Sequence, residues 1–271
     1  MSPSNADYLW HEVHGLDLEA ASFEIATIVQ STVATSPLRM LRYGAIPPDE
    51  FLAWLTRGIR ADLEEEMTHP KIRWMNSKIG DPDQVRYESL VIRDPDLKPL
   101  QAPNRTQQNE DRGRIVAHAA FLYHPPGEKQ THVAGQQKLE KAPNPLPASG
   151  HRELQDHFSK AVETALAAQF GGMHCFEVRE LNVLAPDYLR KGLASKLLKW
   201  IIMRADERNI PIVLAATPPG YPLYLRHGFV EVEGDNRVVE CDMSKWGGMG
   251  IHKHVLMIRE PKPTSTGSAG P

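Results

Sequence analysis

The sequence predicts a mixed α/β domain, in which helices and strands follow one another along a single chain. Two observations carry this prediction. Several long segments repeat apolar residues every three to four positions, which is the pattern of a helix with one buried face. Between them lie shorter runs rich in Val, Ile, Leu and Ala, several of them bounded by Pro or Gly, as strands usually are.

The N-terminal half is predicted to contain two helices followed by two strands. Asp17 can cap the free amides of the first helix, and a second helix follows Pro48 with apolar residues along one face. A short strand is predicted at residues 89–93. A stronger one at residues 114–123 is stopped by the two prolines that follow His124.

The C-terminal half alternates between the two kinds of element. A third helix carries its apolar side at residues 154–166, and Gly171–Gly172 supply a left-handed stop. The clearest helix spans residues 192–209, which the Asn-Ile-Pro sequence ends. The other predicted elements are strands at 175–184, 211–216, 229–232 and 252–259 and a short helix at 221–227.

Composition restricts the class of protein. The chain has 271 residues, 41% of them hydrophobic and 24% charged, as in an ordinary globular protein. A net charge of −3 gives no electrostatic reason to expect nucleic acid or an anionic membrane as partner. No apolar run approaches the length of a membrane-spanning helix. Cys175 and Cys241 are expected to be reduced thiols in a cytoplasmic protein, and without a CxxC motif no metal site is predicted.

Proline marks the irregular parts of the chain. The 22 prolines cluster at residues 94–103, 125–147 and 261–271, which we interpret as long surface loops and a tail. The predicted organisation is therefore an N-terminal extension (1–16), one domain (17–260) and a disordered tail (261–271).

The segment LNVLAPDYLRKGLASKLLKWI, residues 181–201, combines a strand, a tight turn and the start of a helix. The first amides of a helix have no partner within it and suit a phosphate or pyrophosphate. Gly192 permits close approach of an anion, Ala194 is small, and Arg190 and Lys191 add positive charge. Taken alone, the segment is also consistent with a plain connection bearing solvated charges.

A second segment, VLAATPPGYPLYLRHGFVEV, spans residues 213–232. A buried strand, a short helix with a tyrosine, and a Gly-Phe pair resemble the second signature of the GNAT (N-acetyltransferase) superfamily, at Tyr224, Gly228 and Phe229. Residues 181–195 resemble its first signature. The resemblance covers about residues 17–260 and is closest to the fungal small-molecule-type members. Leu189 departs from the pattern, because the family usually has Gln or Arg at the start of this loop.

The resemblance implies a GNAT fold: a central mixed, mostly antiparallel sheet, flanked by helices and splayed at an acyl-CoA site. The co-substrate would be acetyl-CoA, with pantetheine along the splayed strand and pyrophosphate on the following loop, and no metal. The implied cofactor-binding residues are Val183, Leu184, Ala185, Leu189, Arg190, Lys191, Gly192, Leu193, Ala194 and Ser195.

In this family an amine attacks the thioester directly. Tyr224 falls at the tyrosine position and is the expected proton donor, with Tyr221 as a substitute. Alternation along the strand would place Arg179, Leu181 and Val183 on one face, where Leu181 and Val183 should pack on a helix. The opposite face would then present Glu180 as the base and Asn182 as an orienting group. Alternatives are a core tyrosine, a solvated glutamate, or a histidine base, for which the candidates are His118, His124 and His174.

The acceptor is predicted to be a small-molecule amine, with a monomer or homodimer as the assembly. Possible pocket residues, which are more often simply core, are Trp54, Trp74, Met75 and Trp246. The acidic stretch at residues 62–67 could attract a cationic amine or could be a solvated helix end. Three alternatives stay open: an acyl-CoA sensor or accessory protein without transferase activity, transfer to a hydroxyl, and a decarboxylation.

Overall fold

The structure is a computed structural model that describes residues 9–12, 17–68, 86–102, 113–126 and 144–262. Its helices and strands, together with two short 3-10 helices, are β1 (Leu9–Glu12), α1 (Leu18–Ser31), η1 (Val33–Thr35), α2 (Pro37–Tyr43), α3 (Pro48–Thr68), β2 (Arg86–Asp94), β3 (Arg114–His124), α4 (Arg152–Phe170), β4 (Cys175–Val183), α5 (Leu193–Arg208), β5 (Ile212–Ala216), α6 (Tyr221–Arg226), β6 (Val230–Glu231), β7 (Val238–Asp242), η4 (Met243–Trp246) and β8 (Ile251–Arg259).

One sheet contains all the described strands, in the order β1-β2-β3-β4-β5-β8-β6, with β7 also paired to β8. Its central pair, β4 and β5, is parallel. The other strand pairs of the described sheet are antiparallel. The predicted α/β class, with a mixed and mostly antiparallel sheet, is therefore confirmed.

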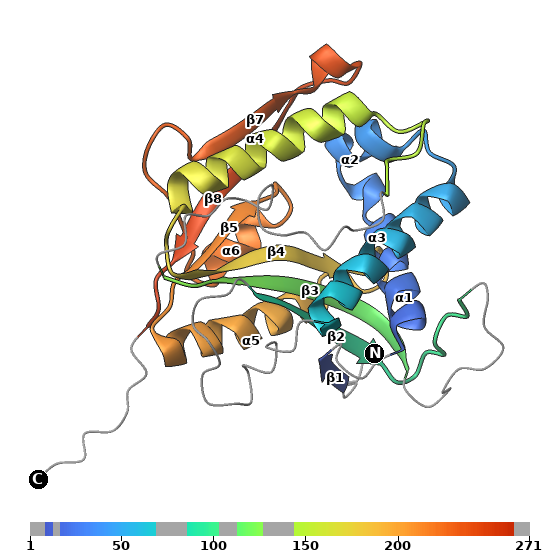
Figure 1. The fold of residues 1–271 in the computed structure, drawn as a ribbon, viewed down its shortest axis with the longest axis horizontal. Helices are drawn as coiled ribbons and strands as arrows, with labels where there is room; N and C mark the ends of the chain where they lie inside the picture. Colours follow the sequence, from blue (N-terminus) through green and yellow to red (C-terminus); the bar gives the residue numbers. More distant parts are fainter. Residues whose placement is uncertain (1–8, 13–16, 69–85, 103–112, 127–143, 263–271) are drawn as a thin grey trace, which may run out of the picture.

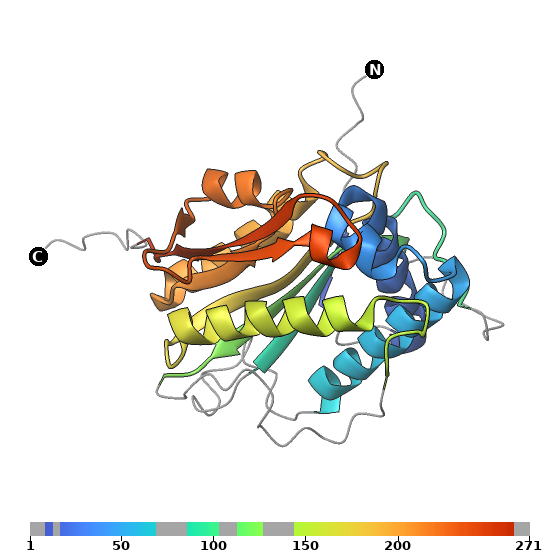
Figure 2. The same ribbon diagram turned by 90° about the horizontal axis from the view of Figure 1, so that it is seen from above.

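Helices cover both faces of this sheet (Figures 1 and 2). Because side chains alternate along a strand, neighbouring residues of β4 and β5 serve different faces. Phe176 and Ile212 belong to an apolar cluster with α1 and α5. Cys175 and Val213 belong to a second cluster, with α4, β7 and β8. The two helices α4 and α5 therefore lie on opposite sides of the β4–β5 pair, as Figure 1 shows.

The helix ends follow the predicted signals closely. The Asp17 carboxylate accepts the amides of Glu19 at 3.1 Å and Ala20 at 3.4 Å. Helix α5 runs between two caps in the left-handed region, Gly192 and Asn209. At the end of α4 the predicted Gly171–Gly172 stop is present, with Gly172 (φ 81°) as its left-handed residue and Gly171 at φ −58°.

Besides the two 3-10 helices, two strands and one α-helix of the described chain were not predicted. Strand β1 lies within the expected N-terminal extension and pairs with β2 at the edge of the sheet. Helix α2 begins after Ser36, whose side chain accepts the Arg39 amide. Strand β7 pairs with β8.

Cys175 and Cys241 are buried and carry thiols rather than a shared disulfide. Among the described helices, none combines the length and the apolar character needed to cross a bilayer.

Candidate active site between β4 and β5

The parallel strands β4 and β5 separate soon after they begin. Only Phe176 pairs with Ile212 and Glu177 with Val213, although β4 continues to Val183. On its other edge β4 stays paired with β3 as far as Val183. The splay that the resemblance implies is therefore present, and it leaves one edge of β4 with backbone groups that can bind an extended ligand.

The backbone bonds show which part of β4 faces this opening. The Leu184 amide donates to the Val116 carbonyl on β3 at 2.9 Å, and the Ala185 amide donates to Ser31 Oγ at 3.0 Å. Because backbone groups alternate between the two edges of a strand, those of Val183 point towards the opening. Of the three residues predicted to bind the cofactor through their backbone, Val183 therefore has its backbone groups directed at the opening. The amides of Leu184 and Ala185 instead donate to groups of the protein.

A cavity of about 300 Å³ occupies the mouth of this opening. Strand β4 contributes Asn182 and Val183 to it, the following loop Leu189, and α5 Ala194. Tyr224 of α6 lies on its wall. Residues from both predicted motifs thus meet in one cavity beside the open edge of β4.

The N-terminus of α5 borders this cavity. Gly192 adopts φ 80° and, within the described chain, no side chain caps the helix. A Cβ placed on Gly192 would have no described atom within 4 Å, so the approach to the first amides is open. Unpaired amides at the positive end of a helix are a suitable site for a phosphate group. The residues therefore fit the pyrophosphate of coenzyme A.

The other predicted cofactor residues play different parts. Leu189 is 41% exposed and lines the cavity, whereas Leu193 is core. The Lys191 ammonium lies 4.3 Å from the centre of the Tyr188 ring, and Arg190 adopts a left-handed conformation (φ 62°). Ser195 Oγ lies 3.1 Å from His227 Nε2, so its hydroxyl has a protein partner.

Tyr224 is 8% exposed, and burial raises the pKa of its phenol, which therefore remains protonated at neutral pH. Its ring packs edge-on against Phe229 at 5.5 Å. Among the described residues its hydroxyl has no hydrogen-bond partner, so it can donate to a ligand. Tyr221 instead donates to Glu231 at the surface. Of the two tyrosines only Tyr224 lines this cavity, and its role as proton donor stays a prediction.

A β-bulge alters the predicted face pattern of β4. Ala120 of β3 pairs with Glu180 and Phe121 with Val178, which leaves Arg179 as the extra residue. Arg179 consequently shares the side of Glu177, to which its guanidinium donates at 3.0 Å, and not the side of Leu181. The placement of Arg179 was wrong. Leu181 and Val183 do pack against the cluster that includes α5, as predicted.

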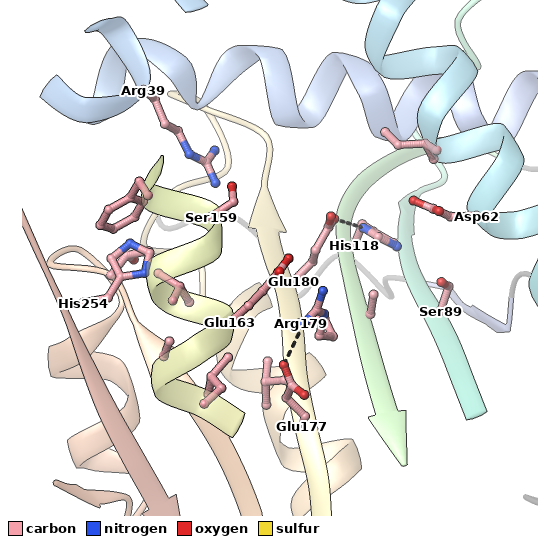
Figure 3. A pocket seen from close by; sticks show the side chains of 18 of the residues that line it. Arg39, Asp62, Ser89, His118, Ser159, Glu163, Glu177, Arg179, Glu180 and His254 are labelled. Atoms are coloured by element: carbon pink, nitrogen blue, oxygen red, sulfur yellow. Dashed lines mark hydrogen bonds and ion pairs between the residues drawn. The ribbon is translucent and has the colours of Figure 1, made fainter. Parts of the chain in front are cut away.

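Glu180 and Asn182 share the opposite side, as predicted. The Asn182 amide donates to Glu180 at 3.3 Å, and His118 Nδ1 lies 3.6 Å from the same carboxylate. Glu180 lines a second cavity, of about 420 Å³, between α3, α4 and the sheet (Figure 3). The Glu180 side chain is 45% exposed at this cavity, and its partial desolvation, with secondarily the charge of Asp62, raises its pKa.

The histidine alternatives differ in position. His118 is 3% exposed and lines the second cavity, and burial lowers its pKa to about 4. His124 is buried against the Glu177 carboxylate at 2.8 Å, and His174 contacts the Tyr123 hydroxyl at 3.0 Å. Neither His124 nor His174 lines either of the two cavities. Of the three candidate histidines, His118 is therefore the one that shares a cavity with Glu180.

The predicted acceptor residues are mostly elsewhere. Trp54 packs in a small separate cluster and donates to the Asn144 carbonyl, and Trp246 contacts His151 and His157. Trp74 and Met75 lie outside the described residues. Of the acidic stretch, Asp62 lines the second cavity, whereas the Glu64 carboxylate binds Arg60 at 2.7 Å.

Several lining residues were missed by the sequence reasoning. Arg39 and Arg42 of α2 line both cavities, as do Thr217 and His254. The Ser-Pro sequence at residues 36–37 is a helix-start signal that could have located α2 and therefore its arginines. In the described chain, no group of three or more His, Cys, Asp or Glu residues could hold a metal ion.

Comparison with known proteins adds three solved structures to these findings. An N-acetyltransferase from Staphylococcus aureus Mu50 is 13% identical, with a TM-score of 0.43 over 94% of this chain and 99% of that one. PaiA N-acetyltransferase from Thermoplasma acidophilum, in complex with coenzyme A, is 10% identical, with a TM-score of 0.43 over 94% and 99%. Naa20 from Chaetomium thermophilum, in complex with a bisubstrate analogue, is 10% identical, with a TM-score of 0.39 over 93% and 86%.

No family model matches the sequence, and no curated protein matches it. The identities and TM-scores of the three structures are too low to support a functional argument. The geometry between β4 and β5 therefore carries the functional conclusion.

Proposed function

We propose that this protein is an acyl-CoA-dependent N-acyltransferase of the GNAT type, which transfers acetyl from acetyl-CoA to a small-molecule amine. The observation that carries the proposal is the early separation of the parallel strands β4 and β5, which pair at only two positions. The opening lies beside an uncapped helix N-terminus and a tyrosine whose hydroxyl has no partner in the described chain. These features together fit a thioester whose pyrophosphate binds at α5.

In the proposed reaction the amine forms a bond to the thioester carbonyl carbon, and the carbon–sulfur bond breaks. Glu180 accepts the proton of the amine, with Asn182 orienting its carboxylate. The raised pKa of Glu180 brings it closer to neutral pH, where a general base is most effective. Tyr224 donates a proton to the departing thiolate.

A second candidate is a protein that binds acyl-CoA without transferring the acyl group. It is favoured by Leu189, which is 41% exposed in the cavity and cannot bind a phosphate where the family usually has a polar side chain. Tyr224 and Glu180 favour the enzyme, because Tyr224 borders the cavity proposed for the donor and Glu180 borders the adjoining one proposed for the acceptor.

The test uses the full-length protein with acetyl-CoA, followed by a panel of amines and matching alcohols. Calorimetric binding of acetyl-CoA, together with amine-dependent release of thiol, is the expected result. Binding without thiol release for any acceptor would establish the second candidate. Release with alcohols in place of amines would move the acceptor to a hydroxyl. No binding of any acyl-CoA would remove all three.

A further inference from the structure

The two cavities meet at a positively charged boundary. Arg39, Arg42, Thr217 and His254 line both of them, so the boundary has two guanidinium groups from one short helix, α2. Figure 3 shows Arg39 extending from the ribbon above towards Ser159 of α4.

Neither guanidinium is neutralised by the protein. Arg39 donates to the Thr32 hydroxyl, and the Arg42 Nε donates to the Gln155 side-chain oxygen at 2.6 Å, so both partners are uncharged. Across the described residues, no carboxylate lies within 4 Å of either group. The imidazole of His254, at the same boundary, is uncharged, because burial and the nearby positive charges lower its pKa to about 3. A half-buried cationic pair without a counter-charge favours an anionic ligand.

The opposite wall of the second cavity has the complementary character. Glu180 of β4 and Asp62 of α3 both line it, and their charges interact. His118, 3% exposed, has both ring nitrogens without a hydrogen-bond partner in the described structure. Figure 3 places Asp62 and His118 on one side and Arg39 on the other, with Glu180 between them.

The opposite charges interact across the cavity without forming an ion pair. Arg39 acts to lower the pKa of Glu180, against the larger effect of burial. No ion pair within 4 Å joins Arg39 to Glu180 in the described chain. The cavity thus presents a cationic end and an acidic end at a distance, which is the pattern that a small zwitterion would complete.

We propose that the acceptor is an amino acid, or a small amine that carries a carboxylate. Its carboxylate binds at Arg39 and Arg42, and its amine lies beside Glu180. This inference depends on the proposed function, which supplies the acyl donor. A carboxylate on the acyl chain of a dicarboxylic acyl-CoA is the other source of the same anionic group. The amino acid is favoured because the acidic wall in the same cavity binds its amine.

The experiment compares matched acceptors with the full-length enzyme and acetyl-CoA. Each amino acid is tested beside its carboxamide and its decarboxylated amine, for example L-methionine, L-methioninamide and 3-methylthiopropylamine. We expect kcat/KM to be at least about 10²-fold higher for the best amino acid than for its amide. Arg39→Gln should raise KM for the amino acid about 10- to 100-fold and leave the amide unchanged, while Arg39→Lys should retain part of the preference.

Arg57→Gln is the matched control, because this arginine of α3 bonds to Asn144 at the surface and does not line either described cavity. Equal use of amino acid and amide by the wild type would overturn the inference while leaving acyl transfer intact. A preference for succinyl-CoA over acetyl-CoA that is lost in Arg39→Gln would also overturn it, by assigning the arginines to the acyl chain.

A calorimetric titration separates failure of the inference from failure of the proposed function. Amino acids are titrated into the protein with and without coenzyme A. Binding that Arg39→Gln abolishes supports the carboxylate site even if no acyl-CoA is turned over. Turnover of amines in the absence of any preference for a carboxylate sustains the function and removes the inference. Absence of both binding and preference removes the inference as well.

Discussion

The two edges of β4 behave differently over the same nine residues. Towards β3 the strand is paired along its whole length, with one bulge. Towards β5 it is paired at two positions and then open. The paired edge carries buried structural contacts, such as the one between His124 and Glu177. The open edge borders the cavity with Asn182, Val183 and Tyr224. One edge of β4 is therefore held by the sheet, while the other is free of strand pairing where we propose that the ligand binds.

If the open edge is where chemistry occurs, the largest effect should come from Tyr224→Phe. Loss of the hydroxyl removes the proton donor but keeps the ring packed on Phe229. We expect kcat to fall about 10²- to 10³-fold, with the KM for acetyl-CoA changed less than about threefold. Steady-state thiol release over a range of acetyl-CoA concentrations measures both.

Tyr221→Phe provides the matched control one turn away. Its hydroxyl binds Glu231 at the surface, so we expect wild-type kinetics. Unchanged kcat in Tyr224→Phe would leave that tyrosine as a core residue, and equal losses in both variants would indicate a general effect on α6.

Glu180→Gln should have the next largest effect, about 10²-fold on kcat/KM for the acceptor. Because the pKa of Glu180 is raised, its basic form appears at a higher pH than that of an ordinary glutamate. The wild-type rate should therefore fall as the pH drops through this raised pKa, and the variant should lack that acid limb. A pH profile of kcat/KM for the acceptor, measured at saturating acetyl-CoA, tests this.

Glu163→Gln is the comparison for charge alone, because Glu163 lines the same cavity from α4. Figure 3 shows it near Glu180. The Glu163→Gln variant should retain the acid limb in its pH profile of kcat/KM. An acid limb that persists in Glu180→Gln would transfer the role of base to another group, with His118 the first candidate.

The paired edge should respond in stability instead of chemistry. Burial acts to raise the pKa of Glu177, but His124 and Arg179 together lower it from 4.5 to about 2. The lowered pKa stabilises the folded state above pH 4.5, and this contribution is lost as the pH falls towards 2. Between pH 6 and pH 3 the wild type should lose about 2 kcal/mol more than Glu177→Gln.

Urea unfolding at the two pH values gives this difference. Glu233→Gln, an exposed change outside the sheet, should match the wild type at both. If the free energy of unfolding changed equally with pH in the wild type and in Glu177→Gln, the interactions of Glu177 with His124 and Arg179 would not contribute to stability.

The sequence predicted best where local chemistry decides the structure. The cap at Asp17 and the two ends of α5 depend on residues next to them in the chain, and they lie within a residue of the predicted positions. The splay and the place of Tyr224 were implied by two motifs in the correct order. Each of these signals lies within a short segment, so it is visible without knowledge of the fold.

The rest depends on contacts between distant segments. The bulge at Arg179 arises from the register between β3 and β4, which a simple alternation rule does not contain. Strand β1 has four residues and, among the described strands, pairs with β2 alone. The boundary between the cavities combines Arg39 of α2, Thr217 after β5 and His254 of β8, which are far apart in the chain. The first signature predicts where the proposed donor site lies, whereas the proposed acceptor site is recognisable only in the folded structure.

The smallest predicted effect gives the sharpest comparison, because two glycines share one backbone conformation. Gly192 adopts φ 80° and ψ 5°, and Gly247 adopts φ 82° and ψ 8°. A Cβ at either position has no described atom within 4 Å. Gly192→Ala and Gly247→Ala should therefore each cost about 1 kcal/mol of stability, from the left-handed backbone alone.

Only Gly192 borders the proposed pyrophosphate position, where a methyl group would hold the anion away from the α5 amides. We expect the Kd for coenzyme A, measured by calorimetry, to rise about 5- to 10-fold in Gly192→Ala and to remain unchanged in Gly247→Ala. Since the strain is matched, any difference in affinity reports contact with the ligand. Equal affinities would place the pyrophosphate elsewhere, and the open edge of β4 would then lack the anchor on which its proposed role depends.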